Sequence, residues 1–369
     1  MLRQPLRYPP RPLAADRWLW ALGKIRVAIN NVLYILGAGF SAPLGRPVIS
    51  NFLTVSKDMY QREPKKYEHF ALIYDRLDRI GKAKSYVNCD LFNIEEILSI
   101  LEMESYVTGK DLSREFTRYI ADVVTHCTPR LVAPGKPTRS DWFQSMFDAG
   151  DEQGLSQIYF EFVAKLFNLV FRWDGRAITS WVAEQPKIRY GVITLNYDLV
   201  IENIVAELNR KYAPKRRLDF LFEPSEADPY GTPYRLSVAK LHGSLHPLTI
   251  VPPTWNKTRG PEIEKAWKLA KRLISHANYL RFVGYSLAPS DLYIRYLLIT
   301  GILDSMNLKG IDVISLDPGQ VHENYKLLFT FSAFRFAEQD VRDHLRYLAC
   351  PNGLVTGEEF FSDSRDEAW

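Results

Sequence analysis

The sequence is poor in cysteine: only Cys89, Cys127 and Cys350 occur in 369 residues, and they lie far apart. No Cys-x-x-Cys pair exists, which argues against a zinc module built on cysteines and against a disulfide framework. So few cysteines are typical of a protein from a reducing compartment. Long apolar runs are also missing, since no uninterrupted stretch of about 18 apolar residues predicts a spanning helix.

A strong charge of one sign is missing as well. The chain carries 47 Lys and Arg against 43 Asp and Glu, a formal net charge of +4. This small excess does not indicate a nucleic-acid binder. Residues 1–14 contain arginines interrupted by prolines with no apolar run behind them, so they are not a signal peptide. We therefore expect a cytoplasmic protein without direct nucleic-acid or membrane binding.

The most informative stretch runs from Asn31 to Pro47. Residues 32–36 are apolar at every position, which predicts a short buried strand. Gly37, Gly39 and Ala42 then fit a Gly-x-Gly-x-x-Ala turn, whose glycines let the backbone approach a diphosphate. A helix beyond the turn would offer free N–H groups to that charge. A glycine turn that merely leaves a strand would look the same.

Further strands are predicted at 188–194, 236–241, 279–283 and 311–316, with a last one at 326–336. Helical patterns fill the spaces between them, at about 198–211, 261–275, 290–304 and 338–349. This alternation predicts an α/β fold, a Rossmann-like doubly wound parallel sheet. The chain contains no Gly-x-x-x-x-Gly-Lys-Ser/Thr motif, and no segment that reads as a separate sensor or ATPase domain.

The first two predicted strands are separated by far more chain than a crossover needs. Helices are predicted there at 50–62, 67–81, 90–106, 112–125 and 155–171, with a loop at 128–141 and no clear strand. We therefore expect an inserted helical subdomain at 50–185. Residues 1–30 would form an N-terminal extension and helix, and residues 31–49 with 186–369 the Rossmann-like core.

Ligands of such sheets bind beyond the carboxyl ends of the strands. Polar or glycine-containing segments follow each predicted strand and would converge there; their candidate residues are Gly37, Ala38, Gly39, Phe40, Ser41, Thr194, Asn196, Asp198, His242, Gly284, Tyr285, Ser286 and Asp317. A dehydrogenase would place an acidic residue about 20 positions after the glycine turn, at a strand end. Asp58 has that spacing but lies in a helical pattern, so hydride transfer is disfavoured.

Two of these residues suit proton and water chemistry. The Asn196 amide can donate and accept hydrogen bonds at once, which suits holding a ribose hydroxyl or an attacking water. The alternative is that Asn196 caps the helix expected near Asp198. His242 can take a proton near neutral pH, but a lone histidine is more often a buried structural residue. His246, before Pro247, is a weaker rival for the same role.

The joint pattern resembles the Sir2 (sirtuin) superfamily. The matching residues occur in the family's order; they are Gly37-Ala38-Gly39-Phe40-Ser41 with Gly45 and Pro47, then Thr194, Asn196 and Asp198, then His242-Gly243-Ser244, then Gly284 with Ser286. By this resemblance Asn196 and His242 are the catalytic pair. NAD+ binding falls to residues 37–41, Thr194, Asp198, residues 284–286 and Asp317.

The departures from the family pattern are as informative. The chain cannot build the four-cysteine zinc module of the protein deacylases, so no metal is expected. The family's Gly-Ile-Pro-Asp-Phe-Arg reads Gly45-Arg46-Pro47-Val48-Ile49-Ser50. Leu195 replaces the glutamine before the catalytic asparagine, and no acyl-lysine channel segment is obvious after His242. These features look like the bacterial Sir2-like proteins of antiphage defence.

This second resemblance implies an NAD+ glycohydrolase that takes NAD+ as substrate, needs no zinc and releases nicotinamide and ADP-ribose in abortive infection. A homo-oligomer is also expected, and the resemblance implies a HerA-type hexameric ATPase as partner. The apolar helices of the insertion at 50–185 would form the contact surface of the oligomer, or their apolar faces would pack on one another. Two alternatives stay open. One is an NAD-dependent protein deacylase or ADP-ribosyltransferase, and the other is a non-catalytic subunit that senses NAD+ or ADP-ribose.

Overall fold

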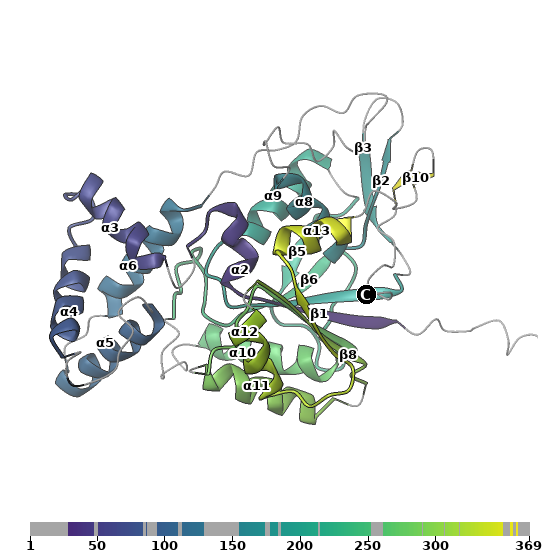
Figure 1. Cartoon of the computed structure of the whole chain (residues 1–369). Coiled ribbons are helices and arrows are strands. Elements are labelled where there is room, and N and C mark those ends of the chain that lie inside the picture. Colours follow the sequence, from purple (N-terminus) through teal and green to yellow (C-terminus); the bar gives the residue numbers. More distant parts are fainter. Residues whose placement is uncertain are drawn as a thin grey trace, which may run out of the picture.

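We describe a computed structural model of the chain (Figure 1). The described residues are 29–47, 51–83, 86, 94–109, 113–128, 155–173, 178–183, 186–212, 215–251, 261–289, 291–305, 307–316, 318–349, 355–356 and 359–360. Most of the predicted N-terminal extension and helix, most of the predicted loop at 128–141, and Asp317 lie outside these residues.

A seven-stranded sheet forms the centre of the described structure, in the order β5-β6-β4-β1-β7-β8-β9. Its strands are β1 (Asn30–Leu36), β4 (Ile188–Thr194), β5 (Asp219–Leu221), β6 (Arg235–Lys240), β7 (Tyr279–Val283), β8 (Gly310–Ser315) and β9 (Phe334–Glu338). Every neighbouring pair is parallel. The predicted Rossmann-like parallel sheet is therefore confirmed, with β1 at its centre.

Helices cover both faces of this sheet (Figure 1). One face is covered by α8 (Leu155–Leu166), α9 (Val200–Tyr212) and α13 (Val341–Ala349), and the other by α10 (Pro261–Ser275), α11 (Leu292–Leu303) and α12 (Pro318–Lys326). Within β1, Tyr34 packs into the first core while Leu33 and Ile35 pack into the second. This double burial explains why residues 32–36 of the strand are apolar at every position.

A separate helical unit follows the short helices α2 (Ala38–Ser41) and η1 (Ala42–Leu44). It consists of α3 (Phe52–Arg62), α4 (Phe70–Ala83), α5 (Ile94–Thr108) and α6 (Ser113–His126), which share one hydrophobic core around Phe70 and Tyr119. Ile250 belongs to this core, and Tyr197 and Leu245 pack against it. The helical unit therefore lies against the loops that follow β4 and β6.

The prediction that residues 50–185 contain no strand is wrong. β2 (Leu169–Trp173) and β3 (Ile178–Val182) form a small antiparallel sheet with β10 (Val355–Thr356) and β11 (Glu359–Phe360). The predicted helix at 155–171 ends early because Asn168 takes a left-handed conformation, with φ of 51°. In addition, α8 packs into the core of the large sheet, not that of α3–α6.

Smaller differences from the prediction concern the C-terminal half of the chain. The short strand β5 and the helix α12 were not predicted from the sequence. β5 is an edge strand of the large sheet, and α12 packs on one face of that sheet. The strand predicted at 326–336 is found at Phe334–Glu338, because Lys326 ends α12 and residues 327–333 form a turn before the strand. In the described part of the chain, no helix is both long enough and apolar enough to cross a membrane.

We expect the buried carboxyl group of Glu161, in α8, to make the stability of the fold depend on pH. Glu161 is 8% exposed, and burial raises its pKa to about 7, partly offset by a hydrogen bond of 2.9 Å from Gln157 Nε2. The ordinary value is 4.5, so the folded chain holds the proton more tightly than the unfolded chain. The stabilisation is complete below the ordinary pKa and is lost as pH rises through about 7.

We therefore expect Glu161→Gln to raise the free energy of unfolding at pH 8 by about 2–3 kcal/mol relative to the parent. At pH 4.5 the two proteins should differ much less. Urea unfolding at both pH values measures this. Glu262→Gln, which alters an exposed carboxylate, is the matched control. An equal gain for Glu161→Gln at both pH values would contradict a titrating carboxyl.

Candidate active site

The strand order reverses at β1, because the chain continues from β1 to β4 on one side and reaches β7 on the other only later. Open α/β sheets bind ligands in the crevice at such a reversal, outside the carboxyl ends of the strands. The segments that meet there are the glycine turn after β1, the loops after β4 and β6, and the loop after β7. All four were predicted to carry candidate residues.

The glycine turn lies directly on the loop after β7. The Gly37 N–H donates to Val283 O at 3.1 Å, and the Gly39 N–H donates to Gly284 O at 2.8 Å. A Cβ added to Gly39 would lie 2.8 Å from Gly284 Cα, so neither side of this contact has room for a side chain. The Phe40 N–H is also used, by Gly37 O at 2.9 Å. The glycines thus serve backbone packing, and fewer amides than expected remain for a diphosphate.

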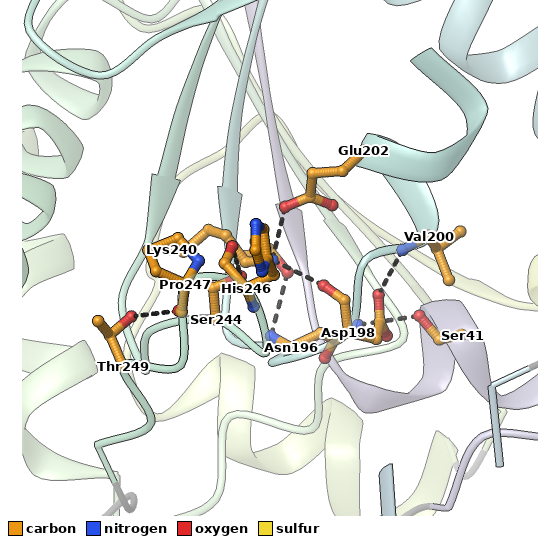
Figure 2. A network of polar contacts seen from close by, with 11 residues as sticks. Ser41, Asn196, Asp198, Val200, Glu202, Lys240, Ser244, His246, Pro247 and Thr249 are labelled. Carbon is orange, nitrogen blue, oxygen red and sulfur yellow. Dashed lines mark hydrogen bonds and ion pairs between the residues drawn. The ribbon is translucent and has the colours of Figure 1, made fainter. Parts of the chain in front are cut away.

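Asn196 joins the loop after β4 to this turn (Figure 2). Its Nδ2 donates to Gly37 O at 2.9 Å and to Ser41 Oγ at 3.2 Å, while its backbone N–H donates to Thr194 Oγ1 at 3.0 Å. The alternative that Asn196 caps α9 is wrong, because Asp198 Oδ1 accepts the Val200 N–H at 3.1 Å instead. The amide of Asn196 is therefore held at the glycine turn.

Lys240 and Glu202, two charged residues that the sequence analysis did not select as candidates, lie next to Asn196 and the glycine turn. Lys240 Nζ donates to Asp198 O at 2.6 Å and forms an ion pair of 2.7 Å with Glu202 Oε1 (Figure 2). Lys240 and Glu202, together with Phe40 and Asn196, line a small pocket. The signal that could have found them is their position, at the end of β6 and in the first turn of α9.

His242 follows β6 as Asn196 follows β4. Thr194 pairs with Lys240 in the parallel register, so Asn196 and His242 each lie two residues beyond a matched pair. His242 is 4% exposed, and its ring lies 5.9 Å from that of Tyr197 at an interplanar angle of 35°. The Leu245 N–H donates to Tyr197 O at 3.0 Å, which ties the two loops together. Such burial suits a structural histidine as well as a catalytic one.

The remaining predicted residues divide by where their side chains lie. The Phe40 ring is 2% exposed and packs edge-on against Tyr159 at 5.2 Å. The Tyr285 hydroxyl donates to Asp291 Oδ2 at 2.7 Å within the core. Ser286, in contrast, is exposed. A ligand at the crevice would therefore meet the backbone of Tyr285 and the hydroxyl of Ser286. Asp317 lies outside the described residues.

Comparison with known proteins bears on this site. A model described as a SIR2-like domain matches residues 191–316, which include the loops that carry Asn196, His242 and Gly284. This match supports the Sir2 superfamily. No curated protein matches the chain. In the residues that the structure describes, no group of three His, Cys, Asp or Glu is placed to hold a metal ion.

Solved Sir2 structures are similar to the chain at low identity. A Sir2 complex with the inhibitor EX-527, 2'-O-acetyl-ADP-ribose and deacetylated p53 peptide is 14% identical, covering 90% of this chain and 96% of that one (TM-score 0.34). A Sir2 complex with p53 peptide and NAD+ is 14% identical, covering 91% and 97% (TM-score 0.34). A third, on the mechanism and regulation of Sir2 enzymes, is 13% identical, covering 86% and 90% (TM-score 0.36).

Proposed function

We propose that this chain is an NAD+ glycohydrolase that cleaves the bond between nicotinamide and ribose. One observation carries the proposal: Asn196 Nδ2 bonds to Gly37 O and Ser41 Oγ, so the residue proposed for catalysis lies at the turn proposed for NAD+ binding. The SIR2-like match covers Asn196 and supports an NAD-related activity. Sequence departures at residues 45–50 and the scarcity of cysteine favour hydrolysis over deacylation.

The reaction makes modest demands on the protein. Breaking the C–N bond expels neutral nicotinamide and leaves an oxocarbenium-like ribose, which water attacks to give ADP-ribose and one proton. Asn196 has both amide hydrogens committed to the turn, so its Oδ1 is the group that would accept a hydrogen bond from a ribose hydroxyl or the water. His242, on the neighbouring loop, would accept the proton.

The proposal is tested by incubating the purified chain with NAD+, with and without an acylated peptide, and identifying the products. Free nicotinamide and ADP-ribose formed without peptide are expected. Acyl-ADP-ribose formed only with peptide would instead identify a deacylase, and transfer of ADP-ribose to protein would identify a transferase. Binding of NAD+ without consumption, under every condition, would identify a sensing subunit.

We further propose that the chain acts in the cytoplasm as the NAD-depleting effector of antiphage defence, held inactive until triggered. The expected partners are a second copy of the chain and a HerA-type ATPase. The helices α3–α6 bury most of their apolar faces in one core, but Tyr106 and Val107 of α5 stay exposed and are compatible with the expected contact surface. Tyr296 and Leu303 on α11 are exposed as well. The NAD+ assay is therefore run with the chain alone and with the ATPase, with oligomer mass measured by light scattering. A monomer in both mixtures would contradict the assembly proposal.

A further inference from the structure

Arg46 is a buried arginine whose environment is only half explained by the fold. Its side chain is 4% exposed, and Nη1 donates to Val124 O at 2.7 Å and to Thr128 Oγ1. Val124 belongs to the last turn of α6, where a cation suits the free carbonyls and the helix dipole. These contacts account for one of the three nitrogen atoms of the guanidinium group.

The other two nitrogens lack a partner. Nε and Nη2 of Arg46 are buried and have no hydrogen bond within the described part of the chain. These two atoms form one edge of the planar guanidinium group, the edge that binds two oxygen atoms of an anion side by side. An arginine that is buried with this edge free lacks the compensation that buried charges require.

The charged groups around Arg46 also leave room for an anionic ligand. Burial lowers the pKa of Arg46, while Asp198 and Cys127 raise it. Asp198 therefore lies within electrostatic range, but no carboxylate of the described residues forms an ion pair with Arg46. The chain geometry places Arg46 next to the site, because Arg46 follows the cap of η1, which continues directly from α2. Ser41 at the end of α2 accepts a hydrogen bond from Asn196, so Arg46 lies five residues from a direct contact of the candidate catalytic residue.

The glycine turn has few free N–H donors, and this indicates which part of a ligand Arg46 would bind. The N–H groups of Gly37, Gly39 and Phe40 are already donated to protein carbonyls, so the turn alone offers few donors to a diphosphate. Lys240 is already engaged by Glu202. The phosphates are the only anionic groups of NAD+, and the free edge of Arg46 matches a phosphate oxygen pair.

We propose that the Nε–Nη2 edge of Arg46 binds the diphosphate of the dinucleotide. This inference rests on the proposed function, because it takes NAD+ as the ligand of the crevice. Arg46 departs from the Sir2 pattern, which has isoleucine between the glycine and the proline that correspond to Gly45 and Pro47. Because Nη1 also holds the end of α6, ligand binding would fix the helical unit α3–α6 against the crevice.

The test compares ligands with and without the diphosphate, by calorimetric titration of ADP-ribose and of adenosine. Arg46→Gln should raise the Kd of ADP-ribose about 10–100-fold, the effect of losing a charged hydrogen-bond pair, and change that of adenosine less than about twofold. Arg46→Lys keeps the charge without the edge and should also weaken ADP-ribose. Inorganic pyrophosphate should compete with ADP-ribose on the parent protein.

Arg76→Gln is the matched control, because Arg76 is 12% exposed in α4 and paired with Glu104 at 2.7 Å, within the helical unit. It should leave both affinities unchanged. If Arg46→Gln loses the fold in thermal melting, Arg46→Lys decides. Unchanged ADP-ribose affinity in the folded variant, or equal weakening of adenosine, overturns the diphosphate contact. A parent that binds ADP-ribose without consuming NAD+ overturns the hydrolase and leaves the contact standing.

Discussion

NAD+ turnover is expected to fall about 10²–10⁴-fold when His242 is replaced by alanine, the typical contribution of a general base. Asn196→Ala is expected to cost about 10²–10³-fold, as for the loss of one aligned polar group at a reacting centre. Since both residues would act in one step, the double variant should be little slower than the worse single variant. Initial rates of nicotinamide release measure all three.

His246→Ala is the control for His242, because its imidazole is exposed and lies in the same loop. It should keep turnover within about twofold of the parent, within the range of ordinary surface substitutions. Ser41→Ala tests how much the position of Asn196 depends on Ser41, since it removes the 3.2 Å contact and leaves the 2.9 Å bond to Gly37 O. Its loss of rate should be clearly smaller than that of Asn196→Ala.

The competing explanation is that buried His242 only supports the fold. His242→Gln separates the two, because glutamine retains polar atoms in a similar volume but cannot act as a base at neutral pH. A catalytic role predicts a parent-like melting temperature, parent-like ADP-ribose affinity and lost turnover. Retained turnover in folded His242→Gln, with the parent's pH profile, would show that another group takes the proton.

Strand positions were predictable from sequence where burial on both faces leaves no ambiguity. The ranges 188–194 and 279–283 match β4 and β7 residue for residue, because both central strands are rich in aromatic and branched apolar residues, although Arg189 and Arg281 interrupt them. Burial also misled the prediction for α8, because the buried run of α8 continues through Phe167 and resumes in β2 after the half-buried Asn168. Only Phe167 and the left-handed Asn168 separate the two elements, and a pattern of apolar residues does not reveal a backbone angle.

Relations between distant residues were the part that sequence could not supply. The glycine turn was predicted as a phosphate cradle, yet the structure shows that Gly39 donates its amide to Gly284, 245 positions along the chain. Arg46 was visible only as a departure from a family pattern. The end of α6 supplies an acceptor for Nη1 of Arg46 but none for Nε and Nη2, and this becomes known only once the position of the helical unit is known.

Gly284→Ala is expected to destabilise the fold by about 2–5 kcal/mol, the sum of backbone strain and overpacking. Gly284 has φ of 62°, and an added Cβ would lie 2.3 Å from Gly39 C and Phe40 N. These are backbone atoms, so no side-chain rotation can relieve the clash. The glycine turn and the loop after β7 would have to separate, and binding of ADP-ribose should be lost with them.

Gly45→Ala isolates the strain from the clash. Gly45 has φ of 80°, but a Cβ there would meet nothing within 4 Å. Its cost should therefore be only the about 1–2 kcal/mol of a left-handed alanine. Urea unfolding of both variants measures the difference, which reports the contact between the two loops. Equal losses of stability in the two variants would mean that these loops are not in contact. That result would contradict the crevice proposed to bind NAD+, which is built on this contact.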